Sequence, residues 1–163
     1  MAVVHLRIDN RLIHGQVTVG WVNLVGADHM ICTNDQVAKD PVQKMFLPQA
    51  ARGIKTSVLS VADTVAYVKG EQAAKEKILI IAKFPEDAFA LIEAGVEPKE
   101  ANVGNQALLP GTKPIHVTRS VAVLPEHAPM YRAIAAKVGK LTYQVMTSDK
   151  TQNFIDLMEK KGL

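Results

Sequence analysis

The sequence predicts an α/β fold: an open, mainly parallel, twisted β-sheet of about seven strands with helices on both faces, built as one domain over residues 1–163. Short apolar runs alternate with helical patterns along the whole chain, which is the order of strand–helix–strand units. Some runs, such as "ILIIA" at 78–82, are apolar throughout, as expected for strands that are buried on both sides. A chain of 163 residues without internal repeats or linkers is long enough for one core.

Strands are expected where apolar runs end at polar or turn-forming residues. The stretch 106–120 carries two prolines and a glycine in "ALLPGTKPIHVTRS". It is therefore expected to include a long loop, and the strand at its end could be broken. The expected strands cover 3–8, 29–33, 56–59, 77–82, 101–103, 115–123 and 141–146.

Helices are expected between these strands. The segment 15–25 carries an apolar stripe that includes Trp21. Three other segments have N-terminal signals: an aspartate before a proline at 40–41, capping-box spacing at 60–63, and a proline followed by two acidic residues at 85–87. The expected helices cover 15–25, 41–51, 61–69, 85–94, 129–138 and 151–160.

The composition excludes several classes of protein. The net charge of +3 comes from 19 basic and 16 acidic side chains that are scattered along the chain, and only 5% of residues are aromatic, so no nucleic-acid partner is expected. Cys32 is the only cysteine, which rules out an internal disulfide, and its apolar run "HMICT" predicts a buried side chain.

Neither a targeting segment nor a membrane span is expected. His5 and Arg7 interrupt the first apolar run, and the uncharged run 12–27 contains several polar residues. The protein is therefore expected in the cytoplasm. The histidines outside the first turn lack metal-ligand spacing, so we expect no metal and no cofactor, and structural roles for them. They are His5, His29, His116 and His127.

The stretch "RIDNRLIHGQVTVGW" at 7–21 places Asp9, Asn10, Arg11 and His14 between the first strand and the first helix. In open α/β sheets, ligands bind beyond the carboxyl ends of the strands. This turn is therefore the first candidate site. The other residues expected at the same edge are Asn34, Asp35, Lys83, Phe84, Gly104 and Asn105; Asp35 is expected to cap a helix or to hydrogen-bond within the loop.

The residue types in this turn suit phosphoryl transfer. His14 would lie at the N-terminus of a helix that begins at Gly15, where anions are favoured and a protonated imidazole is not. Asp9 or Asn10 could hold one ring nitrogen and fix the tautomer. Arg11 can present two parallel N–H groups to a phosphoryl group. From the residues alone, a capped structural turn in a non-catalytic interaction module remains the alternative.

Five segments of the chain form a recognisable set of motifs. They are "RIDNRLIHGQV" at 7–17, "NDQVAKDP" at 34–41, "KTSVLSVADTV" at 55–65, "AKFPEDAFALIEAGV" at 82–96 and "NVGN" at 102–105. In order and spacing they resemble enzyme IIB of the mannose/sorbose/N-acetylgalactosamine branch of the bacterial sugar phosphotransferase system, and the resemblance covers nearly the whole chain.

This resemblance implies that His14 is phosphorylated, and it suggests Nδ1 as the nitrogen. The phosphoryl group would come from a phosphohistidine of the IIA component and pass to a sugar that the membrane components IIC and IID translocate. Arg11 would stabilise the group in transfer. The remaining implied site residues, with orienting or phosphoryl-binding roles, are Asp9, Asn10, Gly15, Gln16, Lys83, Phe84, Gly104 and Asn105. A homo-oligomer and peripheral association with the membrane transporter are also implied.

The sequence departs from the family pattern at the expected walls of the site. Phe84 stands where a small polar residue is common, Gln106 and Ala107 replace a methionine and a histidine, and the loop at 109–120 diverges. The sequences of the segments "RIDNRL" and "NVGN" resemble most the family members that handle N-acetylgalactosamine or galactosamine. Arg7, Arg11 and Lys83 are expected to face acidic partner surfaces. Two rival classes lack their motifs: nucleotide-binding enzymes (G-x-G-x-x-G, or G-x-x-x-x-G-K-[ST]) and serine hydrolases (G-x-S-x-G).

Overall fold

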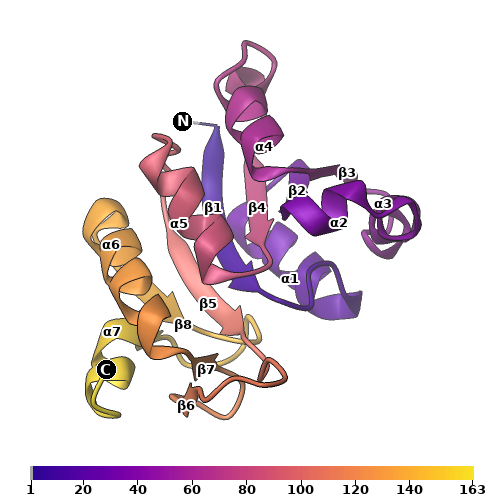
Figure 1. Cartoon of the computed structure of the whole chain (residues 1–163). Helices are drawn as coiled ribbons and strands as arrows, with labels where there is room; N and C mark the ends of the chain where they lie inside the picture. Colours follow the sequence, from indigo (N-terminus) through magenta and orange to yellow (C-terminus); the bar gives the residue numbers. More distant parts are fainter. Residues whose placement is uncertain (1) are drawn as a thin grey trace.

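The computed structural model describes residues 2–163, apart from the side chains of Gln16 and Val17, and is built around one seven-stranded sheet (Figure 1). The strand order is β3-β2-β4-β1-β5-β8-β9. Every neighbouring pair is parallel except β8 and β9, which are antiparallel. The sheet therefore confirms the predicted fold class.

The strands of the sheet are β1 (Val3–Asp9), β2 (His29–Thr33), β3 (Lys55–Leu59), β4 (Ile78–Ala82), β5 (Ala101–Asn105), β8 (Leu141–Tyr143) and β9 (Gln152–Asn153). The α-helices are α1 (Gly15–Val25), α2 (Asp35–Lys39), α3 (Pro41–Ala50), α4 (Val61–Val68), α5 (Pro85–Glu93), α6 (Ala128–Val138) and α7 (Phe154–Glu159).

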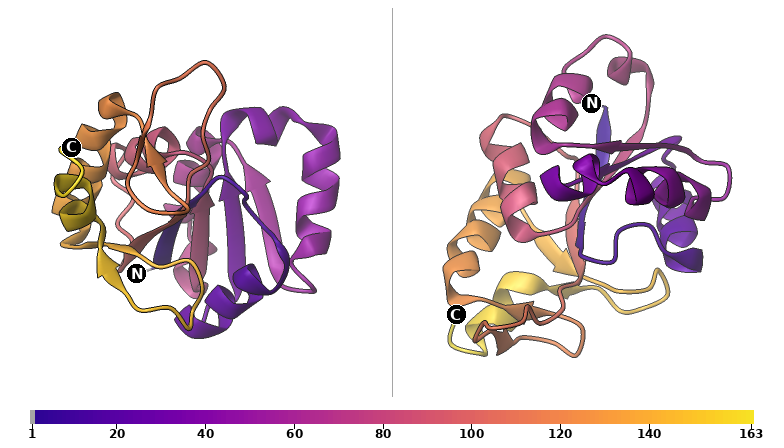
Figure 2. Two further views of the ribbon diagram at one scale, coloured as in Figure 1. Left: turned by 90° about the horizontal axis from the view of Figure 1, so that it is seen from below. Right: turned by 45° about the vertical axis from the view of Figure 1, so that its right-hand side comes forward.

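The helices cover both faces of the sheet (Figure 2). Side chains alternate along each buried strand, and in β4 Ile78 and Ile80 join one hydrophobic cluster whereas Leu79 and Ile81 join the other. The first cluster includes residues of α4 to α7, and the second includes residues of α1 to α3. Within it, Cys32 is fully buried, as predicted. The two-sided burial explains why β4 reads as a continuous apolar run.

The strand predicted over 115–123 is broken, which was the expected alternative, and neither part joins the main sheet. Ile115–His116 (β6) and Ala122–Val123 (β7) are two-residue strands that pair with each other outside the main sheet. Between them the chain reverses, because the Thr118 hydroxyl accepts hydrogen bonds from the backbone N–H groups of Ser120 and Val121. The seventh strand of the sheet is instead β9.

Two helix predictions also need correction. The predicted helix over 151–160 begins only at Phe154, because residues 152–153 pair with β8 and the Asn153 side chain caps the helix. Helix α2 was not predicted. Asn34 starts it by accepting hydrogen bonds from the backbone of Gln36 and Val37, and Asp40 then caps α3. Asp35 is the first residue of α2, and its carboxylate accepts a hydrogen bond from the N–H of Val61, the first residue of α4.

Candidate functional site

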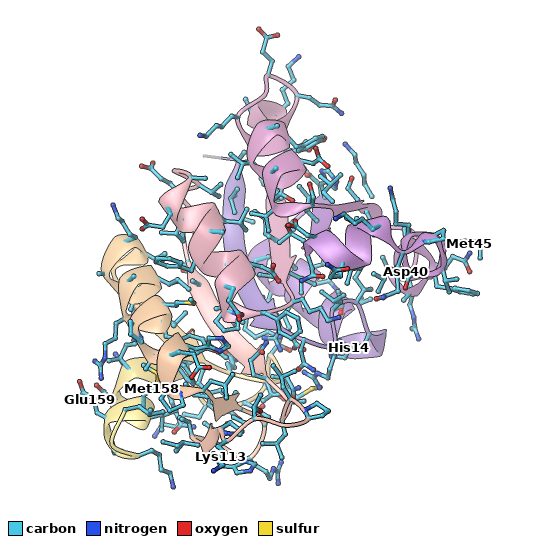
Figure 3. All side chains as sticks on the ribbon, viewed as in Figure 1. His14, Asp40, Met45, Lys113, Met158 and Glu159 are labelled. Carbon is cyan, nitrogen blue, oxygen red and sulfur yellow. The ribbon has the colours of Figure 1, made fainter. Side chains whose placement is uncertain are left out.

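The carboxyl ends of neighbouring strands bring together the first candidate turn and residues from distant parts of the sequence. Asn10 and Asn105 meet beyond β1 and β5: the Asn105 amide donates to Asn10 Oδ1 at 2.6 Å, and the Asn10 N–H donates to the Asn105 carbonyl at 3.1 Å. His14 lies at this end of the sheet, immediately before α1 (Figure 3). The turn after β1 and the end of β5 therefore lie together at the carboxyl end of the sheet, as predicted.

His14 presents a neutral imidazole with one lone pair. Its Nδ1 lies 2.8 Å from the Leu12 carbonyl oxygen, which can only accept, so Nδ1 carries the proton. Nε2 is buried and has no hydrogen-bond partner among the described residues. Burial lowers the pKa of His14, although the Leu12 hydrogen bond and the Asp9 charge oppose the shift. The ring is therefore neutral, with its proton on Nδ1 and its lone pair on Nε2.

The turn before α1 depends on two unusual backbone conformations. Leu12 has φ +59° and Gly15 has φ +46°, in the left-handed region that glycine adopts most readily. The Leu12 conformation brings its carbonyl to the His14 ring. The His14 N–H donates to the Thr18 hydroxyl at 3.0 Å, which closes the first turn of the helix. The ring is therefore held by Leu12, and the prediction that Asp9 or Asn10 holds it is wrong.

Asp9 orients Arg11 instead. It is fully buried, and its two carboxylate oxygens accept hydrogen bonds from Arg11 Nε at 2.9 Å and from Arg11 Nη2 at 2.8 Å. The Arg11 backbone N–H adds a third bond, at 3.1 Å. This two-pronged contact fixes the guanidinium plane. The Arg11 side chain remains 35% exposed, so its outer N–H groups can contact an anion.

Arg7 is the second cation at Asp9. Its Nη2 lies 3.0 Å from Asp9 Oδ2, and its guanidinium also donates to the carbonyls of Gln144 and Val145. Only 2% of the Arg7 side chain is exposed, so the expectation that Arg7 faces a partner is wrong. Two arginines against one carboxylate leave an excess positive charge at the turn.

Gly104 makes room for this arrangement. A Cβ atom at position 104 would overlap the Arg7 guanidinium and would lie 2.8 Å from Asp9 Oδ2. In the structure, Asn105 and Gly104 support the turn, because Asn105 bonds to Asn10 and Gly104 leaves space for Arg7; their predicted phosphoryl-binding roles stay predictions. Sequence reasoning missed the contact between Arg7 and Asp9. Their spacing could have indicated it, because residues two apart in a strand share a face.

A pocket of about 370 Å³ opens beside Arg11. It receives Arg119 from the loop before β7 and Lys150 from the loop between β8 and β9, together with the carboxylate of Asp149. Neither Arg119 nor Lys150 forms an ion pair with any residue that the structure describes. These two exposed cations, which the sequence analysis did not single out, flank the site in place of Arg7.

The comparisons with known proteins agree on one family. The model of the sorbose subfamily IIB component of the phosphotransferase system (PTS) matches residues 3–163. The chain belongs to this family. It is therefore a IIB component, a sugar phosphotransferase component of the mannose/sorbose family of the PTS.

Relatives of this IIB component carry different sugar names. The PTS system sorbose-specific EIIB component of Klebsiella pneumoniae is 34% identical over 157 residues, covering 96% of this chain and 94% of that protein. The fructose-specific EIIB component of Bacillus subtilis is 30% identical over 159 residues, with 97% and 96% covered. The N-acetylgalactosamine-specific enzyme IIB component 2 of Escherichia coli is 38% identical over 120 residues, with 73% and 76% covered.

The solved structures agree with this assignment. The crystal structure of the IIBSor domain of the Klebsiella pneumoniae sorbose permease superposes on this IIB component with a TM-score of 0.89 at 34% identity, covering 98% of both chains. Such an agreement over the whole chain confirms the predicted open α/β sheet of the IIB component.

The departures from the family pattern have structural roles in this IIB component. The Gln106 amide donates to the Lys83 carbonyl at 2.7 Å and joins the ends of β5 and β4. Phe84 precedes α5, its N–H donates to Asp87, and the Lys83 ammonium lies 5.3 Å from the centre of its ring. Lys83 and Phe84 form no hydrogen bond with His14 within the described structure. The side chain of Gln16 lies outside the described residues, so its predicted role stays a prediction.

Among the described residues, no cluster of three or more potential metal ligands occurs. Nor does any helix in residues 2–163 have the length and apolar character needed to cross a bilayer.

Proposed function

We propose that His14 carries the phosphoryl group of this IIB component, accepting it from a phosphohistidine of IIA and passing it to a sugar that IIC and IID translocate. The observation that carries the proposal is the neutral imidazole of His14 in the same turn as Arg11, whose guanidinium is fixed by buried Asp9. A neutral ring supplies the lone pair, and the oriented cation stabilises negative charge on the phosphoryl oxygens.

The first step starts from the tautomer that has its lone pair on the reacting nitrogen, and from that tautomer it requires no further proton transfer. A lone pair of the His14 imidazole forms an N–P bond while the N–P bond of the donor breaks and its electron pair returns to the donor imidazole. In the second step the sugar hydroxyl oxygen forms the P–O bond, the hydroxyl proton passes to solvent water, and the electron pair of the broken N–P bond returns to His14. Arg11 stabilises the transition states of both steps, because in each one negative charge spreads over the same phosphoryl oxygens.

The family resemblance suggests Nδ1 as the phosphorylated nitrogen, and we adopt it as part of the proposal. In the unphosphorylated structure, this nitrogen bonds to the Leu12 carbonyl. Phosphorylation at Nδ1 therefore requires the ring to release Leu12 and its proton to move to Nε2.

Labelling of His14 tests the proposal. The protein should be labelled when it is incubated with phosphoenolpyruvate, the general phosphocarrier protein, its kinase and the matching IIA, and the label should be acid-labile and alkali-stable. His14→Ala should abolish labelling without unfolding the protein. Labelling that persists at another residue would contradict the assignment. A correctly folded protein that never becomes labelled would favour the alternative, a non-catalytic interaction module.

We further propose that IIA and the membrane components bind in turn to overlapping surfaces around His14, since both must reach the same atom. The exposed cations around the site are Arg11, Arg119 and Lys150, with half-buried Lys83 beside them. They favour acidic partner surfaces and an association that weakens with salt. Simultaneous binding of IIA and the membrane components to one protomer would contradict this part.

The proposed sugar is N-acetylgalactosamine or galactosamine. The support is the sequence of the segments "RIDNRL" and "NVGN" and the 38% identity over 120 residues with an N-acetylgalactosamine-specific relative. The sorbose- and fructose-named relatives match more of the chain at lower identity. Deletion of the gene should abolish growth on the amino sugar. Unaffected growth there, with growth on another hexose lost, would replace this sugar with that hexose.

The proposed setting follows from the same role. A protein that exchanges phosphoryl groups between IIA and IIC/IID must lie on the cytoplasmic side and contact the membrane transporter peripherally. We also propose a homo-oligomer, as the family resemblance implies. Sedimentation of the purified protein, alone and with membranes that contain IIC and IID, tests both statements.

A further inference from the structure

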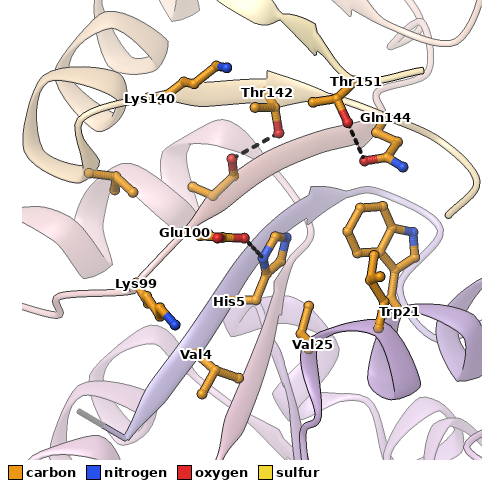
Figure 4. Close-up of a pocket in the computed structure, with 13 residues that line it drawn as sticks. Val4, His5, Trp21, Val25, Lys99, Glu100, Lys140, Thr142, Gln144 and Thr151 are labelled. Atoms are coloured by element: carbon orange, nitrogen blue, oxygen red, sulfur yellow. Dashed lines mark hydrogen bonds and ion pairs between the residues drawn. The ribbon is translucent and has the colours of Figure 1, made fainter. Parts of the chain in front are cut away.

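A second cavity lies away from His14, on the face of the sheet that carries α1. It is a groove of about 620 Å³ between α1 and the loop before β8 (Figure 4). Its floor comes from β1, β5 and β8, which bring His5, Ala101 and Thr142 to it, and α1 forms one wall with Trp21 and Val25. Apart from Gln144, which also lines the pocket beside Arg11, the residues that line the groove lie outside the proposed phosphoryl site.

The floor of the groove contains a buried hydrogen-bond acceptor without a partner. His5 is 3% exposed, and its Nε2 lies 3.0 Å from Asn102 Oδ1. The Asn102 amide donates to the Gln144 carbonyl at 3.0 Å, which fixes its orientation, so His5 Nε2 must carry the proton. Nδ1 is left with a lone pair and no hydrogen-bond partner among the described residues. Burial lowers the pKa of His5, which favours this neutral form.

An unsatisfied buried acceptor is costly unless a ligand or water supplies a donor. The Glu100 carboxylate, with its nearest oxygen 3.8 Å from His5 Nδ1, adds a second group that can only accept from a hydroxyl. Thr142 and Thr151 add hydroxyl groups to the lining of the groove. This polar floor suits a small hydroxylated ligand better than an apolar helix, which would leave these groups unpaired.

The rim of the groove is cationic. Lys99 and Lys140 are exposed and lie toward the left of Figure 4, on either side of Glu100. Neither lysine forms an ion pair with another residue of the described chain. Two ammonium groups against one carboxylate leave a net positive charge, which favours a ligand with an anionic group.

We propose that this groove is a binding site for a sugar phosphate, with hydroxyl groups donating to His5 Nδ1 and Glu100 and the phosphate between Lys99 and Lys140. The acceptors in the groove indicate a ligand with several hydroxyl groups, and the two lysines indicate that it carries an anionic group. The choice of a sugar phosphate over other hydroxylated anions rests on the proposed function, whose product is a sugar phosphate. The site would allow the protein to sense the product away from His14.

Trp21 provides a direct readout. It is the only tryptophan, it lines the groove, and its ring centre lies 5.3 Å from that of His5. Glucose 6-phosphate and galactosamine 6-phosphate, titrated into the unphosphorylated full-length protein, should change tryptophan fluorescence saturably. Free glucose and inorganic phosphate should each bind at least about tenfold more weakly, because each lacks one half of the contacts.

Matched variants test the contacts. His5→Gln keeps a donor toward Asn102 but removes the Nδ1 acceptor, and Lys99→Ala with Lys140→Ala removes the cations; each should weaken binding about tenfold. Lys113→Ala, an exposed lysine outside the groove, should bind like the parent. If His5→Gln fails to fold, the lysine variants and the NMR shifts of Val25 and Thr142 on titration provide the same test.

Three results would overturn the proposal: no saturable change at millimolar sugar phosphate, parental affinity in the lysine double variant, or binding that is lost in Arg11→Ala. The last would place the ligand at the phosphoryl site. Since the titration requires no phosphotransfer, His14→Ala should bind normally. A failure of the proposed function would therefore leave this result unchanged, and the two can be told apart.

Discussion

The Arg7 guanidinium occupies the space where a side chain at Gly104 would project. The same guanidinium bonds to Asp9 and to the carbonyls of Gln144 and Val145, and so joins β1 to the segment that follows β8. It also lies 4.7 Å from the centre of the Trp21 ring. Arg7 therefore fixes the position of Asp9, and through Asp9 that of Arg11.

Gly104→Ala should displace Arg7 and weaken both the fold and the chemistry. The added methyl group cannot fit beside a guanidinium that is buried and bonded on several sides, so we expect a loss of about 2 kcal/mol or more in unfolding free energy. Phosphoryl transfer should slow as well, because Arg11 loses its fixed partner. Thermal unfolding and labelling rates measure the two effects.

Gly20→Ala is the matched control. Gly20 lies in α1, and a Cβ there would meet Thr147 at 3.5 Å, an ordinary contact. In a helix interior alanine is favoured over glycine by about 1 kcal/mol, so stability should stay equal or rise. Equal stability losses at positions 20 and 104 would contradict the role given to Arg7.

Arg11→Lys should separate orientation from charge. Lysine keeps the positive charge but cannot make the two-pronged contact with Asp9 or present a planar fork to the phosphoryl group. We expect transfer from IIA to slow by roughly tenfold to a hundredfold, whereas the affinity for IIA changes much less. Rapid-quench labelling gives the rate, and calorimetry gives the affinity. Equal losses in both would show that Arg11 serves docking alone.

The sequence was sufficient for the elements that carry strong patterns. The run at 78–82 is apolar on both faces because β4 contacts both hydrophobic clusters, and α3 begins at Pro41 with its Asp40 cap as predicted. The pattern was not sufficient for β6, β7 and β9, which are two residues long. Strands of that length bury too few side chains to leave a periodic signal.

The candidate site was predictable in its location but only partly in its contacts. Strand ends and the motif placed Asp9, Arg11 and His14 together. The ring partner could not be read from the sequence, because it is the carbonyl of Leu12, a leucine at φ +59°, and no residue type signals that conformation at a leucine. Arg7 looked accessible as a charge but is buried by loop residues 144 and 145 from the far end of the chain.

His14 should accept phosphoryl groups below the pH at which an ordinary histidine fails. Burial lowers its pKa from the ordinary value of 6.5, so the neutral ring and its lone pair persist as the pH falls through 6.5. The unfolded chain binds its proton first, so this group makes the fold less stable as the pH drops below 6.5. NMR titration of the ring and the pH dependence of labelling should show the same midpoint. A midpoint above 6.5 would contradict the burial argument.

Glu76→Gln should destabilise the fold at neutral pH and much less in acid. Burial alone would raise the pKa of Glu76, but hydrogen bonds from Lys55, His29 and Tyr67 outweigh it and bring the pKa to about 2 from 4.5. A carboxylate with a lowered pKa contributes stability that is complete above pH 4.5 and is lost as the pH falls toward 2. The difference in unfolding temperature between parent and variant should therefore shrink over this range. If the difference in unfolding temperature stayed constant, packing rather than the charge of Glu76 would account for its contribution to stability.

Phosphorylation should break the contact between His14 and Leu12 if it takes place at Nδ1. That nitrogen lies 2.8 Å from the Leu12 carbonyl in the unphosphorylated protein, and a phosphoryl group cannot occupy the same space as the oxygen. Leu12 would then be free to leave its positive φ, and the backbone signals of residues 11–15 should shift strongly on phosphorylation. Two-dimensional ¹⁵N NMR of the histidine ring, with phosphorus coupling, identifies the nitrogen directly. Coupling at Nε2 with unchanged Leu12 signals would refute the Nδ1 assignment, because it would mean that the ring reacts in the orientation that Leu12 already holds.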